Sequence, residues 1–489
     1  MGKITLVRFY SLSLVGILLI AGFLRLYRIS DRLTFLGDEG RDVLVVRDIL
    51  LGRNFPLIGP GTSVGNMYLG PLYYYLISPS LLASGFSPVG PAILVAVIGV
   101  LTVGLVWLLS REWVDSPVAL VITLAYAVSP VVITYSHSSW NPNVMPFFSL
   151  LCIYSIWKVW HNSDWRWLLI TAVSFAFVLN SHYLGILLVP VLGLVWHFSQ
   201  KNLHALRYTL IAVFVFGILM SPLLFFDLRH NGINFNAFKT FVTNRQQTVN
   251  LKAYKAVPNL WPIWVDLNTT LLSPENIQIG TAMSVILILG LLFTLTKFKS
   301  APEILIVLFW IFFGILGLGL YKQHIYAHYY GFLYPAPFLL FGLIIQNIPK
   351  LMKIPVISAL FIAIIYSFIH SPVLSAPNMQ MSRTETVAKF IIDQSGNRPF
   401  NLALLSNHNY DASYRYFLAV NNSRYIPVDQ KITDQLYVIC EKPDPGIPCQ
   451  PINNPLYEIA AFGWSKIDNQ WPFPWQVEVY KLVHNSQGT

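Results

Sequence analysis

The sequence has few charged residues and few cysteines. Only 11% of its 489 residues are Asp, Glu, Lys or Arg, whereas a soluble globular protein carries about a quarter. A single soluble domain, a disordered chain and a coiled coil are therefore excluded. Three cysteines are too few for a disulfide scaffold. Cys152 lies inside an apolar run. Cys440 and Cys449 lie in a polar tail, where they form a disulfide if the tail is exported or otherwise stay free thiols.

Hydrophobic residues are abundant instead, at 55% of the chain, and the mean hydropathy is +0.56. This composition predicts an α-helical polytopic membrane protein, with the lipid bilayer as a partner. The net charge of +10 does not indicate nucleic acid, because the basic residues are scattered between apolar runs and form no stripe.

Apolar runs that are long enough to span a bilayer number about 11. They lie at 5–26, 91–110, 117–135, 144–160, 167–181, 183–198, 208–226, 278–296, 303–321, 328–347 and 354–370. The apolar segment 71–84 is shorter and contains Pro79, so we expect a membrane-parallel helix there.

If 71–84 does not cross, the short loops fall into two sets. One set holds Arg111, Lys158, Arg166, Lys201, Arg207, Lys297, Lys299, Lys350 and Lys353; the other holds only Lys322. The positive-inside rule makes the first set cytoplasmic. We therefore expect a multi-pass protein of the cell membrane in which the loop 27–90, several later turns and the tail are extracytoplasmic.

The polar tail mixes helical and strand patterns. The segments 401–406, 435–440 and 475–483 are typical of strands, and 382–394 and 410–420 of helices. The sequence therefore predicts a transmembrane domain at 1–370, whose first outer loop at 27–90 holds membrane-parallel helices, and a small α/β soluble domain at 371–489.

The first outer loop contains an acidic pair. Asp38 and Glu39 follow the first span, and Arg41 lies near one face of the helix that follows them. A carboxylate at such a site is suited to accept a proton from an attacking hydroxyl or amine. The alternative is that the pair only caps and solvates this helix.

Two further outer turns carry neutral hydrogen-bonding groups. YSHSSWNPN contains His137, Asn141 and Asn143, and His182 lies at a polar break between two closely spaced spans. Amide and imidazole groups are suited to bind a sugar. A plain interfacial turn anchored by Trp140 explains the same residues.

Two later outer segments carry charge. Asp227 and Arg229 directly follow a span, and Arg229 is expected either to pair with Asp227 or to hold a phosphate. YKQHIYAHYYGFLYP carries Lys322, His324, His328 and Tyr329. An aromatic belt explains the tyrosines but not the three basic side chains. The two histidines could bind a divalent metal as a cofactor, but the segment contains no third ligand.

These polar groups share one side of the predicted topology. They lie at the ends of spans, where they avoid the cost of a charge in mid-bilayer, about 2.5–3.5 kcal/mol. Polar groups gathered at a membrane edge indicate a functional site. We expect them to line one cavity at the outer face.

With its ordered motifs, the chain resembles the GT-C type membrane glycosyltransferases, and within them the bacterial protein O-mannosyltransferase and aminoarabinose transferase group. The motifs are RLYRISDRLTFLGDEGRDVLVVRDILLG, GPLYYYL, YSHSSWNPN, SPLLFFDLRHN and HYYGFLYP. The resemblance covers about the first 370 residues. An acidic residue in the first outer loop, followed by two membrane-parallel helices, is a hallmark of the fold.

The resemblance implies a donor in which a sugar is carried on a polyprenyl phosphate. Asp38 matches the family's catalytic acid, which orients or deprotonates a protein, lipid or glycan acceptor, with inversion at the sugar. Asn141 or Asn143 stands where many relatives have an acid. The aminoarabinose enzymes have a lysine before the proline of the second parallel helix; here Tyr68 and its neighbours precede Pro71. The phosphate contact is therefore sought at Arg229, Lys322, His324 or His328.

Other function classes predict other sequences. A transporter or lipid flippase predicts inverted repeats and broken or charged helices in mid-membrane, and neither is evident. A transferase that moves a whole glycan from a diphosphate carrier differs only in its donor and stays open. A structural scaffold would not need so many polar groups on one side.

Overall fold

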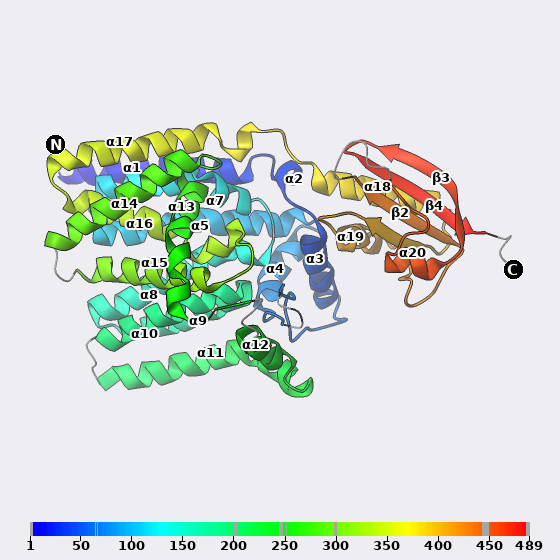
Figure 1. Ribbon diagram of the computed structural model, residues 1–489, viewed down its shortest axis with the longest axis horizontal. Coiled ribbons are helices and arrows are strands. Elements are labelled where there is room, and N and C mark those ends of the chain that lie inside the picture. The colour runs from blue at the N-terminus through cyan, green and yellow to red at the C-terminus, as the bar shows by residue number, and fades with distance from the viewer. Residues whose placement is uncertain are drawn as a thin grey trace. The chain divides into compact units, whose positions relative to one another are not determined.

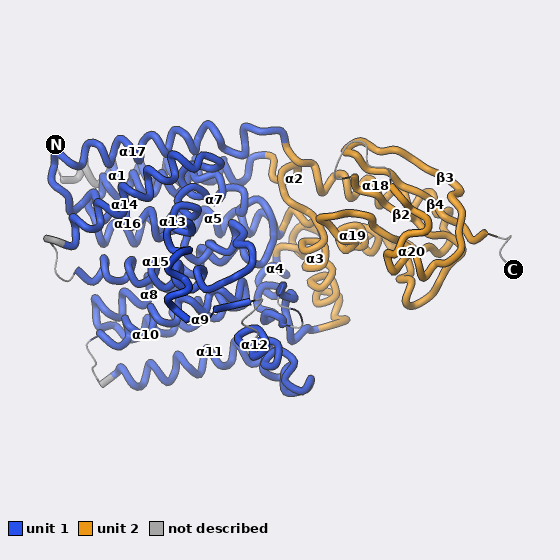
Figure 2. The backbone as a smooth tube through the Cα atoms, viewed as in Figure 1, with its two compact units in different colours: residues 1–27, 55–79, 91–376 blue, residues 28–54, 80–90, 377–489 orange. Residues whose placement is uncertain are grey.

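The computed structural model describes residues 3–63, 65, 67–199, 203–243, 248–250, 252–297, 301–442 and 449–485. Over these residues the chain is helical up to α18 and then forms a four-stranded sheet with two more helices (Figure 1). It divides into two compact units (Figure 2). Unit 1 comprises 1–27, 55–79 and 91–376, and unit 2 comprises 28–54, 80–90 and 377–489.

Unit 1 is a bundle of apolar helices, many of which run side by side (Figure 1). Its long helices are α1 (Lys3–Leu26), α5 (Val89–Trp113), α8 (Met145–Asn162), α11 (Leu203–Arg229), α14 (Ile277–Lys297), α15 (Pro302–Leu320) and α17 (Lys350–Ile369). Its core contains large side chains such as Trp157, Trp310 and Tyr126. The indole of Trp310 donates to the carbonyl of Phe332 at 3.0 Å, so its polar atom is satisfied inside the bundle.

Seven helices of the described residues are long and apolar enough to cross a membrane, and an eighth span results if the bent pair Ala327–Leu333 and Pro335–Asn347 counts as one. These eight coincide with eight of the predicted spans. The other three, 117–135, 167–181 and 183–198, coincide with shorter helices: α6 (Ser116–Val128) with α7 (Pro130–Tyr135), α9 (Trp167–Ser181), and η2 (Tyr183–Leu188) with α10 (Val189–Phe198).

Local chemistry explains why these helices are short. Pro130 has no N–H and disfavours the helical conformation of Ser129, so α6 and α7 are separate. The Ser129 hydroxyl donates to the carbonyl of Leu271 at 2.7 Å. The predicted membrane-parallel segment 71–84 forms α4 (Leu72–Ala83), one of the shorter apolar helices. Of the basic loop residues, Lys201 and Lys299 lie outside the described residues.

Shorter elements of unit 1 complete the bundle. They are η1 (Asn141–Val144), α12 (Ile233–Thr243), η3 (Ala253–Lys255), α13 (Val257–Leu272), η4 (Ala327–Leu333), α16 (Pro335–Asn347) and η5 (Pro372–Leu374). Among them, α12 turns across the end of α11 (Figure 1). This change of direction follows Asn231 and Gly232, which both have positive φ.

Unit 2 is built on a sheet of order β1-β2-β4-β3. The strands are β1 (Asn401–Leu405), β2 (Gln435–Glu441), β3 (Ser465–Phe473) and β4 (Val477–His484). β1 and β2 are parallel, with Ala403 opposite Val438, and the other pairs are antiparallel. The predicted α/β tail is thereby confirmed. β3 was not predicted, because SKIDNQWPF lacks an apolar alternation and is largely exposed.

The helices of unit 2 are α2 (Ile29–Arg32), α3 (Gly37–Leu50), α18 (Gln380–Gln394), α19 (Ala412–Val420) and α20 (Tyr457–Phe462). Apolar side chains of the sheet and α20, among them Leu436, Val438, Phe462 and Leu482, form its core. Cys440 and Cys449 form a disulfide beside this core, which resolves the two alternatives that the sequence left open.

The first-loop helix α3 belongs to unit 2 together with the tail. The sequence assigned residues 27–90 to the membrane domain, but α3 packs against α19. This packing puts the acidic pair of the first loop in direct contact with the C-terminal domain.

Candidate functional site

Asp38 lies in the first turn of α3, held by two donors from unit 2. The Arg41 guanidinium donates to Asp38 Oδ1 at 2.7 Å, and the Tyr410 hydroxyl donates to the same oxygen at 2.9 Å. Oδ2 has no hydrogen bond to a described residue, and the side chain is 41% exposed. A carboxylate fixed through one oxygen can offer the other to a proton donor.

Arg41 links two carboxylates. Besides Asp38 it binds Asp42 Oδ1 through Nε at 3.0 Å and Nη2 at 2.8 Å, and Asp42 is fully buried. The guanidinium is thereby fixed in a fork that also reaches Asp38. Its role in substrate binding stays a prediction. Its contacts include the two acids and the Tyr410 hydroxyl.

Glu39 has a different environment from its neighbour. It is 5% exposed, and its Oε2 accepts the N–H of Leu36 at 3.0 Å, which satisfies one of the free donors at the start of α3. Burial raises the pKa of Glu39 to about 8. These contacts agree with the alternative of a capping role, and its predicted catalytic role finds no support in them.

Three of the predicted residues come together in unit 1. The ring of His328 lies 4.5 Å from that of Trp140 and 5.9 Å from that of His182, and His182 lies 4.8 Å from Tyr329. Turns that are far apart in the sequence therefore meet in one aromatic cluster. His182 Nδ1 accepts the N–H of Leu184 at 3.2 Å, so this imidazole also caps η2.

The other residues of the second outer turn are engaged within unit 1. His137 Nε2 is 3.0 Å from the carbonyl oxygen of Leu24, and Asn141 Nδ2 donates to that of Ser181 at 2.7 Å. Asn143 Nδ2 donates to the carbonyl of Ser138 at 2.8 Å, while its buried Oδ1 accepts no hydrogen bond from a described residue. The buried Asn143 Oδ1 is therefore an acceptor that a substrate hydroxyl can satisfy.

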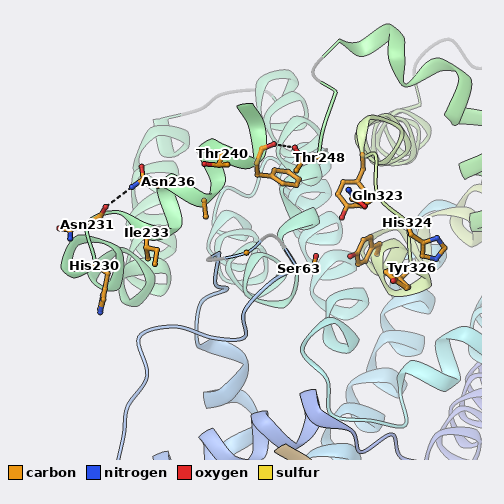
Figure 3. A pocket seen from close by; sticks show the side chains of 15 residues that line it. Ser63, His230, Asn231, Ile233, Asn236, Thr240, Thr248, Gln323, His324 and Tyr326 are labelled. Carbon is orange, nitrogen blue, oxygen red and sulfur yellow. Dashed lines mark hydrogen bonds between the residues drawn. The ribbon is translucent and has the colours of Figure 1, made fainter. Parts of the chain in front are cut away.

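A polar pocket of about 830 Å³ opens between α12 and the segment 321–329 (Figure 3). Asn231, Asn236 and Thr240 lie on one side, and Gln323, His324 and Tyr326 on the other. Tyr329 also lines it. Amides, hydroxyls and aromatic rings are the groups that bind sugars, and the imidazoles of His230 and His324 add donors that suit a phosphate.

An apolar cavity of about 690 Å³ shares Phe241 and Tyr321 with this pocket. Leucines and phenylalanines of η2, α11 and α12 line it, among them Leu187, Leu224 and Phe238. Its lining also includes Tyr68, whose ring packs 5.8 Å from Phe226 and whose N–H donates to Asn234 Oδ1 at 2.7 Å.

Asp227 and Arg229 do not form the ion pair that was one alternative. Asp227 accepts the N–H of Asn234 at 2.6 Å and that of Phe235 at 3.1 Å, and so caps α12. Arg229 is exposed at the end of α11, and no ion pair joins it to a described residue. It does not line the polar pocket, whereas the next two residues, His230 and Asn231, do.

Lys322 lines a second cavity, of about 940 Å³, together with His324, Lys255 and Asp266. The hydroxyl of Tyr330 donates to Asp266 at 2.6 Å. His324 therefore lines both polar cavities. Within the described parts of the chain, no three His, Cys, Asp or Glu side chains cluster closely enough to hold a metal ion.

Sequence reasoning missed Tyr410 and Asn409 as site residues. They lie more than 370 positions from Asp38, as the separation of 372 between Asp38 and Tyr410 shows. One signal was available: glycines flank the acidic pair, at Gly37 and Gly40. A Cβ at Gly37 would overlap the Tyr410 ring, and one at Gly40 would overlap the backbone of Ser413. Such glycines mark a close approach by another segment.

The comparisons with known proteins agree with the sequence resemblance. The sequence model of the family described as dolichyl-phosphate-mannose-protein mannosyltransferase matches residues 69–226. No curated protein matches the chain in sequence. Similar structures include ArnT from Cupriavidus metallidurans bound to undecaprenyl phosphate, with 12% identity, 98% of each chain covered and a TM-score of 0.63.

Two other structures are similar over much of this chain. The oligosaccharyltransferase AglB from Archaeoglobus fulgidus, in complex with an inhibitory peptide and a dolichol-phosphate, has 14% identity and a TM-score of 0.50, with 86% of this chain and 64% of that chain covered. The mycobacterial arabinofuranosyltransferase AftD has 12% identity and a TM-score of 0.54, with 98% and 40% covered. The chain is a multi-pass membrane protein with the GT-C fold, as its motifs predicted.

Proposed function

Because the chain has the fold of membrane glycosyltransferases, we propose that it transfers a glycosyl group from a polyprenyl-phosphate-linked sugar to a hydroxyl or amine acceptor. The carrying observation is that a polar pocket and an apolar cavity share Phe241 and Tyr321. A lipid-phosphate sugar has the same division, with a hydrocarbon chain beside a polar head. Undecaprenyl phosphate and a dolichol-phosphate are bound in two of the similar structures.

The apolar cavity receives the isoprenoid chain nearest the head group. Its lining residues, such as Leu187, Leu224 and Phe238, offer a surface that is favourable for hydrocarbon at about 25 cal/mol per Å² buried. The polar pocket receives the head group. His324 and His230 donate to the phosphate oxygens, and the amides of Asn231, Asn236 and Gln323 bind sugar hydroxyls.

Asp38 is the base. Its Oδ2 accepts the proton of the acceptor as the acceptor heteroatom forms a bond to the anomeric carbon. The bond from that carbon to the phosphate oxygen breaks, and the polyprenyl phosphate leaves with the electron pair. A single displacement of this kind inverts the anomeric configuration. The phosphate needs no protonation to leave, and nearby donors stabilise its developing charge.

An extracytoplasmic site fits the chain's chemistry. The Cys440–Cys449 disulfide lies in the same unit as Asp38, and disulfides persist in oxidising compartments. The bias of basic residues towards the opposite loops gives the same orientation. The acceptor is therefore a protein, lipid or glycan of the cell envelope.

The test is consumption of a prenyl-phosphate sugar by the purified protein in detergent. We expect release of the prenyl phosphate by wild type, and a loss of about a hundredfold or more in Asp38→Asn. Asp48→Asn, at an exposed carboxylate at the other end of α3, is the matched control and should retain activity. Movement of the lipid across vesicles without consumption would instead indicate a flippase.

A further inference from the structure

We infer that Tyr410 of the C-terminal domain is a positioning residue for Asp38, holding the carboxylate so that Oδ2 faces the acceptor. The inference rests on the proposed function, in which Asp38 is the base, and deepens it by giving the C-terminal domain a part in the reaction. All the residues concerned belong to unit 2.

The first step is the geometry around Oδ1. The Tyr410 hydroxyl donates to it at 2.9 Å and Arg41 Nη1 at 2.7 Å, while the same guanidinium nitrogen is 3.3 Å from the Tyr410 oxygen. The Tyr410 hydroxyl, the Arg41 guanidinium and the Asp38 carboxylate are therefore each hydrogen-bonded to the other two. An exposed aspartate has a broad χ2 distribution; two donors on a single oxygen select one orientation and leave the other oxygen as the acceptor.

The second step is that Tyr410 is itself held in place. Asn409 Oδ1 accepts the N–H of Gly37 at 2.8 Å and that of Tyr410 at 2.9 Å. Gly37 is the residue before Asp38, so one amide oxygen ties the backbone of the base to the backbone of its partner. The Tyr410 ring lies directly on Gly37, where a Cβ would overlap it.

The third step is the anchor behind Asn409. Its Nδ2 donates to both oxygens of Glu441 at 3.1 Å, and Glu441 in β2 also binds Arg383 at 2.9 Å and the Tyr414 hydroxyl at 2.7 Å. A chain of hydrogen bonds thus runs from a central strand of the tail to the first turn of α3. A connected, partly buried network of this kind restricts the side chains that belong to it.

The fourth step is the protonation state of the phenol. Partial burial, opposed by the charge of Arg41 and reinforced by that of Asp38, raises the pKa of Tyr410. The hydroxyl therefore remains a donor at every pH at which the enzyme would be assayed. Because a donated hydrogen bond stabilises the charged form of a carboxylate, its removal favours the neutral form.

The test is Tyr410→Phe, which keeps the ring on Gly37 and removes only the hydroxyl. We expect kcat to fall about tenfold, with KM for the donor and the thermal unfolding temperature unchanged. The acid limb of the kcat profile moves to higher pH. Unchanged kcat and an unchanged acid limb in an active preparation would overturn the inference.

The matched control is Tyr416→Phe. Its hydroxyl also makes a hydrogen bond within unit 2, to the carbonyl of Phe86, but does not touch Asp38. We expect it to lower the unfolding temperature without moving the acid limb. A purely structural role for Tyr410 predicts that both variants behave alike.

A second readout does not depend on turnover. Carbodiimide labels the protonated carboxyl, so the pH midpoint of Asp38 labelling, followed by mass spectrometry, reports its protonation. Tyr410→Phe should raise this midpoint; an identical midpoint in both proteins overturns the inference. If the midpoint differs between the two proteins but wild type consumes no donor, the proposed function fails while the inference about Tyr410 stands. The two failures are therefore distinct.

Discussion

Gly40 in α3 lies against the backbone of Ser413 at the start of α19, so closely that there is no room for a Cβ between them. Gly37, one turn earlier, has the same relation to the Tyr410 ring. The GDEG motif therefore serves two purposes. Its acids supply the carboxylates, and its glycines let the tail reach them.

Gly40→Ala should destabilise unit 2 and impair activity. The added methyl group overlaps backbone atoms that cannot rotate away, and overpacking of this kind costs about 1–3 kcal/mol. The better helix propensity of Ala returns about 1 kcal/mol at most. Thermal unfolding and hydrogen exchange in α19 measure the effect.

The control for this substitution is Gly22→Ala in α1, where a Cβ meets nothing within 4 Å. It should leave both measurements at or above the wild-type level. Equal stability of Gly40→Ala and wild type, with unchanged exchange in α19, would show that the tail does not dock as tightly as described.

Glu39 should make the stability of the protein depend on pH. The pKa of Glu39 is about 8 in the folded protein, against an ordinary value of 4.5. The folded state therefore retains a proton that the unfolded state releases between these two values. The free energy of unfolding therefore falls as the pH rises from about 4.5 to about 8. Outside this range Glu39 does not make it depend on pH. Glu39→Gln keeps an oxygen for the Leu36 N–H but has no proton to lose.

The measurement is the unfolding temperature of both proteins at about pH 5 and about pH 8. Glu39→Gln should gain stability relative to wild type as the pH rises. An identical pH dependence of the two proteins would mean that Glu39 is ionised in the folded protein over this pH range. An ionised Glu39 would support its predicted catalytic role.

The sequence predicted the architecture well because apolar runs and alternation are local signals. β1, β2 and β4 lie where the patterns at 401–406, 435–440 and 475–483 indicated strands. β3 was not predicted, because most of its residues are polar and exposed and it contains Pro472, so its sequence shows no period-two alternation. Pro130 divides the predicted span 117–135 into two short helices, which the hydropathy of the run does not show. The break at His182 was predicted, because polar residues interrupt the apolar run there.

The site was predicted in part, for a physical reason. The turns that hold Trp140, His182 and His328 could be grouped because all were expected at one membrane face, and their rings are in contact. The hydrogen bonds within each turn could not be predicted from the sequence. Asp227, for example, caps α12 and does not form an ion pair with Arg229. The partner of Asp38 comes from a segment far along the chain. Gly37 and Gly40 indicate that some segment approaches α3 closely, but they do not identify which one.

The apolar cavity offers the sharpest test of the donor's lipid chain. Gly217 in α11 lines it, and a Cβ there would meet nothing within 4 Å. Gly217→Trp should therefore fill the cavity without disturbing the packing of the bundle. We expect KM for a long-chain prenyl-phosphate sugar to rise about tenfold or more, because the indole occupies volume that the isoprenoid would bury.

A donor whose phosphate carries only a methyl group in place of the isoprenoid chain separates this effect from general damage. It does not extend into the cavity, so wild type and Gly217→Trp should use it equally well. Gly193→Trp in α10 is the matched control; Gly193 is exposed and a Cβ there also meets nothing within 4 Å. If Gly217→Trp uses long and short donors with unchanged KM, the lipid lies elsewhere, and the shared boundary at Phe241 and Tyr321 is not where its head group meets its chain.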